Sequence, residues 1–516
     1  MWGLIPTKDK RKYRIVETLF AAKEPVTIRQ LAEQTGASVR IIKYDLDEIS
    51  ESLCGIADSI VTSSDGVSLT LPASIGMDFF QRGLYSEAMS LRFLEIIFFD
   101  ETLGYEDMME QLYLSESSLR RMVQNIQRAL KAYGIALETQ PFRVVGHETL
   151  IRNFYTTYFE EKYTLYDWPF ENVNLEFMEA IISIGFRYFE MPETAMEYHH
   201  YHFLFGVDLI RGLNGHPAPN IHAIPDDFRE QQYADFLDLM MEPIAKLQID
   251  DATARRYFNE IIDWGMFMSV PYLLERMKND VSLQLEIERT QARIQQLARV
   301  FDLPEVTHHF LILQLHSMID FYRLFPPGQI GKKYFLFPTF NSRYNDKMKK
   351  MLPLFYAEAE KMLIAICSER GIFLGEDEQD DLDYLMYILL SRWSQLNVAL
   401  MKKFNSCRII LVSSHQSFKH SEDIATLLRT ELSRYDTIAV FQGKRLSPER
   451  LEGYHFDLLV VTNTPDLEIP QPVLYMNERA MDDRLYLLRQ MTDAIVEKNK
   501  HAYIKSVKER MRRAYA

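Results

Sequence analysis

The chain has 516 residues, of which 58 are basic and 73 acidic, so its formal charge is −15. At about 150 residues per domain the length predicts three or four domains, and 47% apolar residues exclude a largely disordered chain. No apolar run approaches the roughly 18 residues of a membrane span, and the first residues lack the apolar region of a secretion signal, so we expect a cytoplasmic protein with no membrane partner.

The first 75 residues combine short helices with a hairpin pattern. Apolar spacing predicts three helices, over residues 10–22, 28–34 and 39–52. Thr27 and Ser38 are suited to N-cap the second and third helices, and Gly36 ends the second. The alternating stretch 60–71 turns at Asp65-Gly66, as in a β-hairpin. This order predicts a winged helix-turn-helix over residues 1–75.

The third helix carries the first group of candidate DNA contacts. Its apolar residues, expected to be buried, are Ile41, Ile42, Leu46 and Ile49. Its polar residues, expected to contact DNA, are Ser38, Arg40, Lys43 and Tyr44. Up to position 43 there are nine basic and four acidic side chains, although the acidic total excludes a uniformly basic coat protein. The alternative is a small helical core with a solvated basic face.

The same pattern recurs over residues 76–152. Helices are predicted at 86–99, 105–113 and 116–133, and an alternating stretch at 135–146 resembles a second wing. In the last helix, the residues expected to face inward are Leu119, Met122, Val123, Ile126 and Leu130. The candidate DNA contacts are Ser117, Ser118, Arg120, Arg121 and Gln124. This second winged helix-turn-helix contacts DNA or serves a structural role.

The middle of the chain contains a diverged helical repeat. An apolar, histidine-containing helix ends at Arg211 and again at Arg323, each followed by a Gly/Pro loop and a long helix, over 227–248 and 344–370. The two copies are offset by 112 residues at the arginine, which is too long a period for a solenoid repeat. We therefore expect two helical-bundle domains, over residues 170–287 and 288–402.

The remaining residues, 405–516, alternate between strand and helix patterns. Buried-strand runs and shorter strands are predicted at 407–413, 437–441, 457–462 and 473–476. A helix over 421–434 separates the first two, so we expect a small parallel sheet. A final helix over 481–513 ends in a basic cluster. The predicted fold is thus mainly α and multidomain, with one small α/β domain at the end.

This domain order resembles the Mga/AtxA class of transcription regulators of Gram-positive bacteria, over essentially the whole chain. The resemblance implies that the helix-turn-helix units bind promoter DNA. It also implies that the two bundles are phosphotransferase-system regulation domains, phosphorylated on histidine by the phosphocarrier HPr or an EII component. The C-terminal domain would resemble an EIIB component and support a homodimer.

The resemblance also points to particular histidines. In such domains a regulatory histidine lies near the start of the helix that ends in Arg, where His316 fits in the second repeat. In the first repeat that position is Leu204, and His200 shares its face. The candidate phosphorylation sites are therefore His199, His200, His202 and His316. A phosphoryl group adds about two negative charges, which could repel an acidic face or recruit arginine.

The EIIB-like region lacks the residue that would carry phosphate. An active EIIB domain has a cysteine at the end of its first strand, where this chain has Ser413, Ser414 and His415. Cys407 lies before that strand, and the three cysteines, Cys54, Cys367 and Cys407, form no CxxC pair. We expect this domain to sense or dimerise and not to transfer phosphate.

Several alternatives stay open. Each histidine could be a core residue with a satisfied ring nitrogen. The spacing of His199 and His202 permits a metal, but no cysteine or HExxH motif lies nearby, so we expect no metal or cofactor. Phosphate-loop, GxSxG and dinucleotide motifs are absent from the sequence, so we expect no enzyme. The competing functions are a phosphocarrier of the sugar phosphotransferase system and a metabolite-sensing regulator that is not phosphorylated.

Overall fold

A computed structural model of the chain describes most of its residues. They are 1–53, 60–188, 195–219, 226–267, 270–304, 309–324, 336, 340–374, 378–405, 410–432, 436–443, 445–464, 466, 468–476 and 481–514. Cys54, Cys407 and His308 lie outside these ranges. The chain forms two compact units. The first comprises Met1–Asn279, His316–Met348 and Cys367–Leu385, and the second Asp280–Leu315, Lys349–Ile366 and Met386–Ala516.

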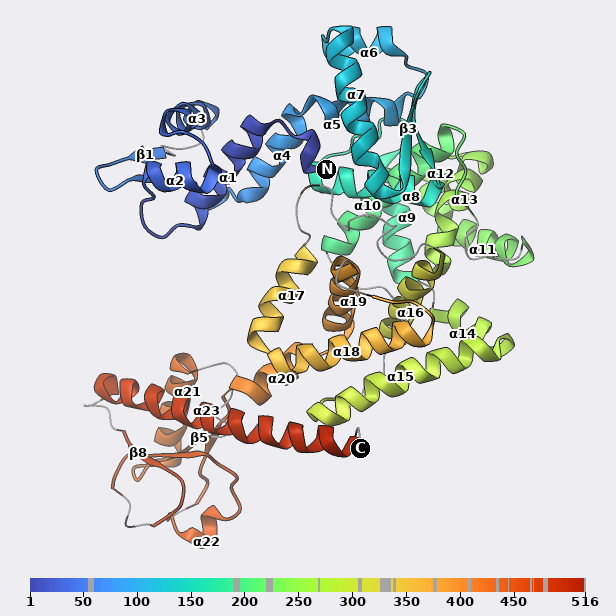
Figure 1. Cartoon of the computed structure of the whole chain (residues 1–516). Helices are drawn as coiled ribbons and strands as arrows, with labels where there is room; N and C mark the ends of the chain where they lie inside the picture. The colour runs from blue at the N-terminus through green and yellow to red at the C-terminus, as the bar shows by residue number, and fades with distance from the viewer. Residues whose placement is uncertain are drawn as a thin grey trace. The chain divides into compact units, whose positions relative to one another are not determined.

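The N-terminal part of the first unit has the expected short helices and hairpin (Figure 1). Its elements are η1 (Trp2–Leu4), α1 (Thr7–Ala21), α2 (Ile28–Thr35), α3 (Val39–Ser52), β1 (Ile60–Thr62) and β2 (Val67–Leu69). The two strands pair antiparallel. Ile15, Leu31, Ile42 and Val67 meet in one core with no exposed surface, so the helices and the hairpin share one hydrophobic centre.

A second, larger set of helices and a hairpin follows. Its elements are α4 (Met77–Glu87), α5 (Met89–Phe99), α6 (Tyr105–Leu112), α7 (Glu116–Leu130), η2 (Lys131–Tyr133), β3 (Ile135–Thr139), β4 (Phe142–Gly146) and α8 (Glu148–Lys162). The expected helix over 86–99 is wrong at its start, because Ala88 has extended backbone (ψ 105°) and separates α4 from α5. Sequence reasoning proposed neither α4 nor α8.

The helical repeat region contains more and shorter helices than expected. Its elements are α9 (Leu175–Tyr188), α10 (Ala195–Leu213), α11 (Asp226–Leu239), α12 (Met241–Leu247), α13 (Asp251–Phe267), α14 (Val270–Asn279), α15 (Val281–Phe301), α16 (His309–Leu324), α17 (Phe340–Met351), α18 (Pro353–Glu369), α19 (Gln379–Arg392) and α20 (Leu396–Asn405). The single helices expected over 227–248 and 344–370 are wrong, since each is divided in two. Pro243 and Pro353 lie in the first turn of α12 and α18, where the missing N–H costs least.

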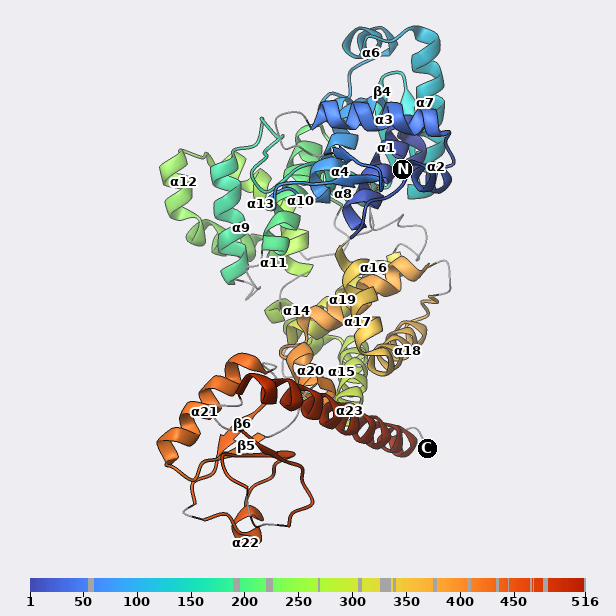
Figure 2. The ribbon, with the colours of Figure 1, turned by 90° about the vertical axis from the view of Figure 1, so that its left-hand side faces the viewer.

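The C-terminal residues form the expected parallel sheet (Figures 1 and 2). Its strands are β5 (Ile410–Ser413), β6 (Ile438–Val440), β7 (Leu458–Val461) and β8 (Val473–Tyr475), in the order β6-β5-β7-β8. Its helices are α21 (Phe418–Glu431), α22 (Pro448–Leu451) and α23 (Met481–Ala514). Alternate residues of β5 face opposite cores: Val412 packs with Leu428 and Leu488, and Leu411 with Phe441 and Phe456.

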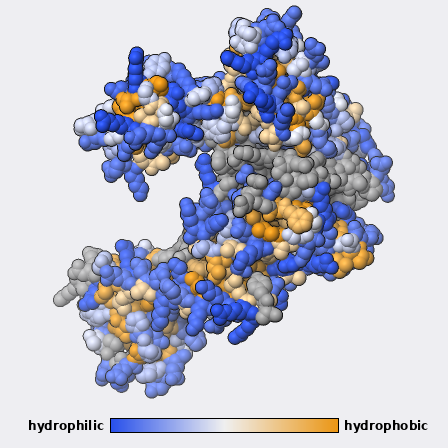
Figure 3. Space-filling model, viewed as in Figure 1, coloured by the Kyte–Doolittle hydropathy of each residue, from blue (hydrophilic) through white to orange (hydrophobic). Residues whose placement is uncertain are grey.

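The surface view shows a largely hydrophilic face with small separate hydrophobic patches (Figure 3). Within the described residues, no helix is both long and apolar enough to cross a membrane. Of the large hydrophobic side chains in the described ranges, Tyr113 and Tyr166 are the most accessible, at 90% and 98%.

Candidate nucleic-acid interface

The pair α2–α3 is shaped by residues that the sequence placed at its ends. Thr27 caps α2, where its Oγ1 accepts from the N–H of Gln30 and the Gln30 side chain accepts from the N–H of Thr27 at 2.8 Å. Gly36 then takes the left-handed conformation (φ 69°), which glycine adopts without strain. Ser38 caps α3 through the N–H of Ile41. These contacts set the direction in which α3 leaves the turn.

The candidate DNA contacts on α3 are all exposed. Arg40, Lys43 and Tyr44 lie on its outer face, and Ser38 is exposed at its start. Arg40 and Lys43 have no ion-pair partner among the described residues, so both charges are available to a ligand. Ile41 was expected to be buried, and that expectation is wrong because its side chain is 41% exposed.

Part of the local positive charge is neutralised inside the first unit. Arg11 holds the buried Asp45 through Nε and Nη2, at 2.5 and 3.0 Å. Lys8 and Lys12 both pair with Glu48, at 2.6 and 2.7 Å. Hydrogen bonds from Lys12, Lys8 and Tyr44 lower the pKa of Glu48 to about 2. Lys8, Arg11 and Lys12 therefore form ion pairs that hold α1 against α3. The basic residues of α3 itself stay available to bind a partner.

The pair α6–α7 repeats the arrangement with a different turn. Tyr113 takes the left-handed position (φ 53°, ψ 43°) that Gly36 holds in the first pair. Ser115 caps α7 by accepting from the N–H of Ser118. A tyrosine in this conformation carries a cost of about 1–2 kcal/mol that glycine avoids. The hairpin β3–β4 packs directly against α7 (Figure 1).

The outer face of α7 carries the second group of candidate contacts. The five residues expected to face inward are buried: Leu119, Met122, Val123, Ile126 and Leu130. Ser117, Arg121 and Gln124 are exposed, and Ser118 is half-buried. Arg120 pairs with Glu116 at 2.7 Å and lies over the Tyr105 ring. Arg121 has no such partner among the described residues, so it is the unpaired cation of this face.

Two of the four candidate regulatory histidines touch α8. His199 Nε2 lies 3.1 Å from the Glu160 carbonyl oxygen, and His200 Nδ1 lies 2.5 Å from the Glu160 carboxylate. The His200 side chain is 47% exposed. Loss of solvent around this ring lowers its pKa, but Glu160 outweighs that effect and the pKa of His200 stands above its ordinary value.

The other two histidines are buried. His202 packs edge-on against Trp168, Nε2 lies 3.4 Å from the Asp167 carbonyl oxygen, and burial lowers the pKa of the ring. His316 lies between Arg370 Nη1, 2.8 Å from Nδ1, and the Asp320 carboxylate, 3.0 Å from Nε2. Nδ1 of His316 is thus hydrogen-bonded, and Nε2 lies within ion-pair distance of a carboxylate. His316 and the histidines of α10 have different surroundings, although the sequence grouped them.

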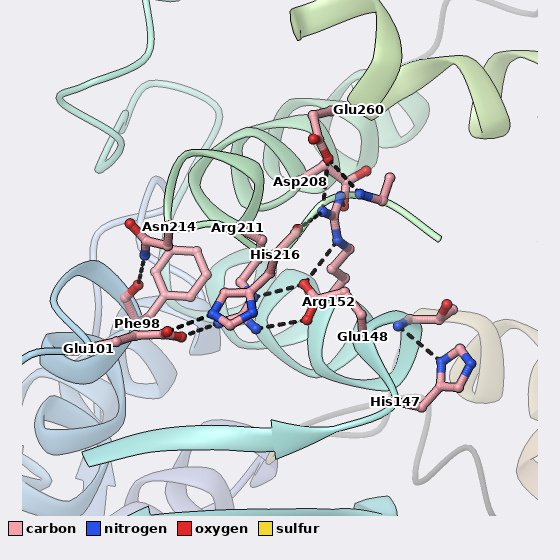
Figure 4. Close-up of polar contacts among 12 residues, drawn as sticks. Phe98, Glu101, His147, Glu148, Arg152, Asp208, Arg211, Asn214, His216 and Glu260 are labelled. Atoms are coloured by element: carbon pink, nitrogen blue, oxygen red, sulfur yellow. Dashed lines mark hydrogen bonds and ion pairs between the residues drawn. The ribbon is translucent and has the colours of Figure 1, made fainter. Parts of the chain in front are cut away.

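A buried polar network joins α8 to α10 and to the end of α5 (Figure 4). Arg211, which is 1% exposed, forms a bidentate salt bridge with Glu148 at 2.9 and 2.7 Å and also contacts Glu101. His216 Nε2 lies 2.6 Å from Glu101, and Asn214 donates to the Phe98 carbonyl oxygen at 3.1 Å. The network thus ties α10 and the turn after it to both α5 and α8.

The same network continues through Arg152 to α13. Arg152 contacts Glu148 at 3.1 Å, Asp208 at 3.1 Å and Glu260 at 2.8 Å. The network holds four carboxylates against two guanidinium groups and one histidine: Glu101, Glu148, Asp208, Glu260, Arg152, Arg211 and His216. Burial, only partly offset by Arg152, raises the pKa of Asp208 to about 7. Asp208 therefore titrates near neutral pH.

Sequence reasoning did not find this network, although a signal was present. Asp208 and Arg211 interrupt an otherwise apolar helix, and Arg152 does the same in an aromatic-rich one. Charged residues are rarely buried unless paired, so charges within apolar stretches indicate partners elsewhere in the chain. The sequence does not say which elements supply those partners.

The end of β5 and the loop after it have polar residues where an active EIIB domain would have its cysteine. Ser413 is buried, and the N–H of Ser414 donates to Ser421 Oγ at 2.8 Å. His415 Nδ1 lies 2.8 Å from Thr462 Oγ1. These bonds fix the loop against α21 and the residue that follows β7.

The part of the chain that contains α6 and α7 is similar to a known class of DNA-binding domain. Residues 75–159 match the family model of the Mga helix-turn-helix domain, which spans almost all of α4–α8. The chain therefore carries a helix-turn-helix domain in which α7 follows the left-handed turn at Tyr113.

The chain is also similar to proteins that are named as regulators. The chain is 21% identical over 511 residues to a protein of Streptococcus pneumoniae serotype 4 whose name describes a trans-acting regulator, covering 95% of this chain and 99% of that protein. It is also 24% identical over 167 residues to AcpB and 23% identical over 173 residues to AcpA, capsule synthesis positive regulators of Bacillus anthracis. Those matches cover 32% and 34% of this chain, and 35% and 36% of the two regulators. The expected resemblance to the Mga/AtxA regulators is confirmed.

Proposed function

We propose that the chain is a transcription regulator that binds promoter DNA through α3 and α7 and is controlled by phosphorylation of a histidine on α10. The outer face of α7 carries the proposal. It places Ser117, Arg121 and Gln124 in solvent opposite five buried apolar residues, within the matched helix-turn-helix domain. A helix presented in this way can enter the major groove, while the hairpin beside it contacts the backbone.

Two cations on α3 and one on α7 are the expected phosphate contacts. Each removed contact should lower the slope of log K against log salt by about 0.9. For the double variant Arg40→Gln/Lys43→Gln we expect this slope to be smaller by about 1.8. For the single variant Arg121→Gln we expect the slope to be smaller by about 0.9. Fluorescence anisotropy with a duplex from upstream of the protein's own gene, over a range of salt, measures these slopes.

Arg128 provides the matched control for the DNA experiment. It is exposed near the end of α7 and bonds to Asn125, away from the start of the helix. Arg128→Gln should leave the slope unchanged. Wild-type slopes in both the α3 and α7 variants would contradict the proposed interface.

Accessibility favours His200 as the phosphorylated residue. A donor protein must reach a ring nitrogen, and His200 is half-exposed whereas His202 and His316 are buried. A phosphoryl group on His200 would place about two negative charges beside Glu160. The resulting repulsion between α10 and α8 supplies a physical route from the modification to the helix-turn-helix domain.

Incubation with phosphorylated HPr, followed by mass spectrometry under conditions that preserve phosphohistidine, tests the regulatory proposal. We expect the phosphoryl label at His200. The variant His200→Gln should lose this label, whereas His202→Gln, which changes the buried neighbour, should keep it. Label confined to His316 would refute the assignment to α10. Absence of any label would favour the competing function, a metabolite-sensing regulator that is not phosphorylated.

The remaining parts of the proposal concern domains and assembly. Residues 1–75 and 76–152 would be the winged helix-turn-helix domains, 170–287 and 288–402 the regulation domains, and 405–516 the EIIB-like domain. The parallel order β6-β5-β7-β8 supports the last assignment. We propose that the EIIB-like domain supports a homodimer, which mass photometry of the full chain at nanomolar concentration tests. A single species at the monomer mass would contradict it.

A further inference from the structure

The end of α23 and the end of α15 enclose a groove within the second unit. Its volume is about 400 Å³. Three of the residues that line it are arginines, and none is acidic: Gln296, Arg299, Val300, Arg510, Arg513 and Ala514. The basic cluster that the sequence showed at the end of the last helix therefore meets a further arginine from a distant segment. The proposed DNA-binding function does not account for this site.

Three hydrogen bonds hold the two helices together around the groove. Tyr503 Oη donates to the Phe301 carbonyl oxygen, and Arg510 Nε donates to that of Val300, both at 2.6 Å. Gln296 Nε2 donates to the Ala514 carbonyl oxygen at 3.1 Å. Arg510 is thereby fixed by its Nε, and its guanidinium group also lies over the Tyr503 ring, 6.0 Å from the ring centroid.

The guanidinium groups retain unused hydrogen-bond donors. Arg510 Nη2 is fully buried and has no hydrogen-bond partner among the described residues. Arg299 and Arg513 are exposed and have no ion-pair partner in the described part of the chain. Asp302, which follows α15, is held by Lys403. A role in satisfying the carbonyl groups at the end of α15 explains Arg510 Nε, and Arg299 and Arg513 complement the helix dipoles from the last turns of α15 and α23. Neither role uses Arg510 Nη2.

We propose that this groove binds a phosphate monoester dianion of a small metabolite. Guanidinium forks match the geometry of phosphate oxygens, and their charge does not titrate near neutral pH. Three arginines that line one groove suit a dianion better than the single charge of a carboxylate or a phosphodiester. The volume lies within the roughly 300–1,000 Å³ range of small-molecule sites. The ligand would bridge α15 and α23.

Calorimetric titration of the full chain with inorganic phosphate and with glycerol 3-phosphate, at constant ionic strength, tests the proposal. We expect saturable binding that weakens at least tenfold in Arg299→Gln with Arg513→Gln. Both side chains are exposed, so the fold should persist, and circular dichroism verifies it. Arg512→Gln is the matched control, because Arg512 is exposed on the same turn and does not line the groove.

Three results would overturn the proposal. The first is the absence of saturable binding of either probe, and the second is equal binding by wild type and the double variant. The third is a loss of duplex-DNA binding in the same double variant, which would assign the arginines to the nucleic-acid backbone. Failure of the α3 and α7 variants to affect DNA binding would refute the proposed DNA interface and leave the phosphate result intact.

Discussion

Substitution of Asp208 by asparagine should remove a pH dependence from the packing of α8 against α10. Asp208 is fully buried, and burial raises its pKa from 3.8 to about 7. The folded carboxyl group therefore binds a proton more tightly than the unfolded one, and the associated stability is complete below about pH 4 and lost as pH rises through about 7. Between about pH 5.5 and 8.5 the expected loss is about 2 kcal/mol, at 1.36 kcal/mol per pH unit.

Hydrogen exchange measured by mass spectrometry can follow this loss at the two helices. After correction for intrinsic exchange, peptides from α8 and α10 report the free energy of local opening. We expect it to fall by about 2 kcal/mol more across that pH range in wild type than in Asp208→Asn. Asp238→Asn is the matched control, because Asp238 is an exposed carboxylate on the neighbouring α11.

The comparison of slopes isolates Asp208 from other titrating groups. His200, whose pKa is also raised, lies on α10, but it is present in all three proteins. Its contribution cancels in the difference between wild type and variant. A slope in Asp208→Asn equal to that of wild type would show that the excess negative charge of the network is neutralised elsewhere, and would refute the reasoning.

Two backbone predictions follow, each measured as a change in the midpoint of thermal unfolding. Gly206→Ala would place a Cβ 2.2 Å from the buried Phe170 ring, so we expect the free energy of unfolding to fall by about 1–3 kcal/mol. The control is Gly185→Ala, on a helix where an added Cβ would meet no atom within 4 Å, and it should raise the free energy of unfolding by about 1 kcal/mol. Equal effects at the two sites would contradict the packing argument. Tyr113→Gly should raise the free energy of unfolding by about 1 kcal/mol, because glycine adopts the left-handed backbone conformation without strain. Gly36→Ala, at the equivalent position, should lower it by about as much. The same sign of change at both turns would argue against that strain.

Local chemistry made α3 and α7 predictable. The bounds of α3 agree with the sequence because Ser38 caps its start and because its apolar residues recur with helical spacing. All five inward residues of α7 were correct for the same reason. Capping and periodicity depend on neighbours within a few positions, so a single sequence contains the necessary information.

Tertiary contacts decided what the sequence could not. The break at Ala88 lies in a continuous helical pattern without proline or glycine, and α4 packs against α1 and α8, which the sequence does not reveal. Asp45 is buried because Arg11, 34 positions away, reaches it. Glu101 and His216 belong to one network although 115 positions separate them. Such pairs depend on which helices meet, and no local pattern specifies that.

The position of α8 limits how this protein can be divided or recombined. Its residues Phe154, Tyr155, Tyr158 and Phe159 are buried, and Arg152 depends on carboxylates of α10 and α13. A fragment that ends within α8 would expose aromatic surface, and one that ends just after it would leave a buried arginine with fewer partners. Exchange of helix-turn-helix segments between related regulators should therefore succeed only when α10 and its contacts are transferred with them.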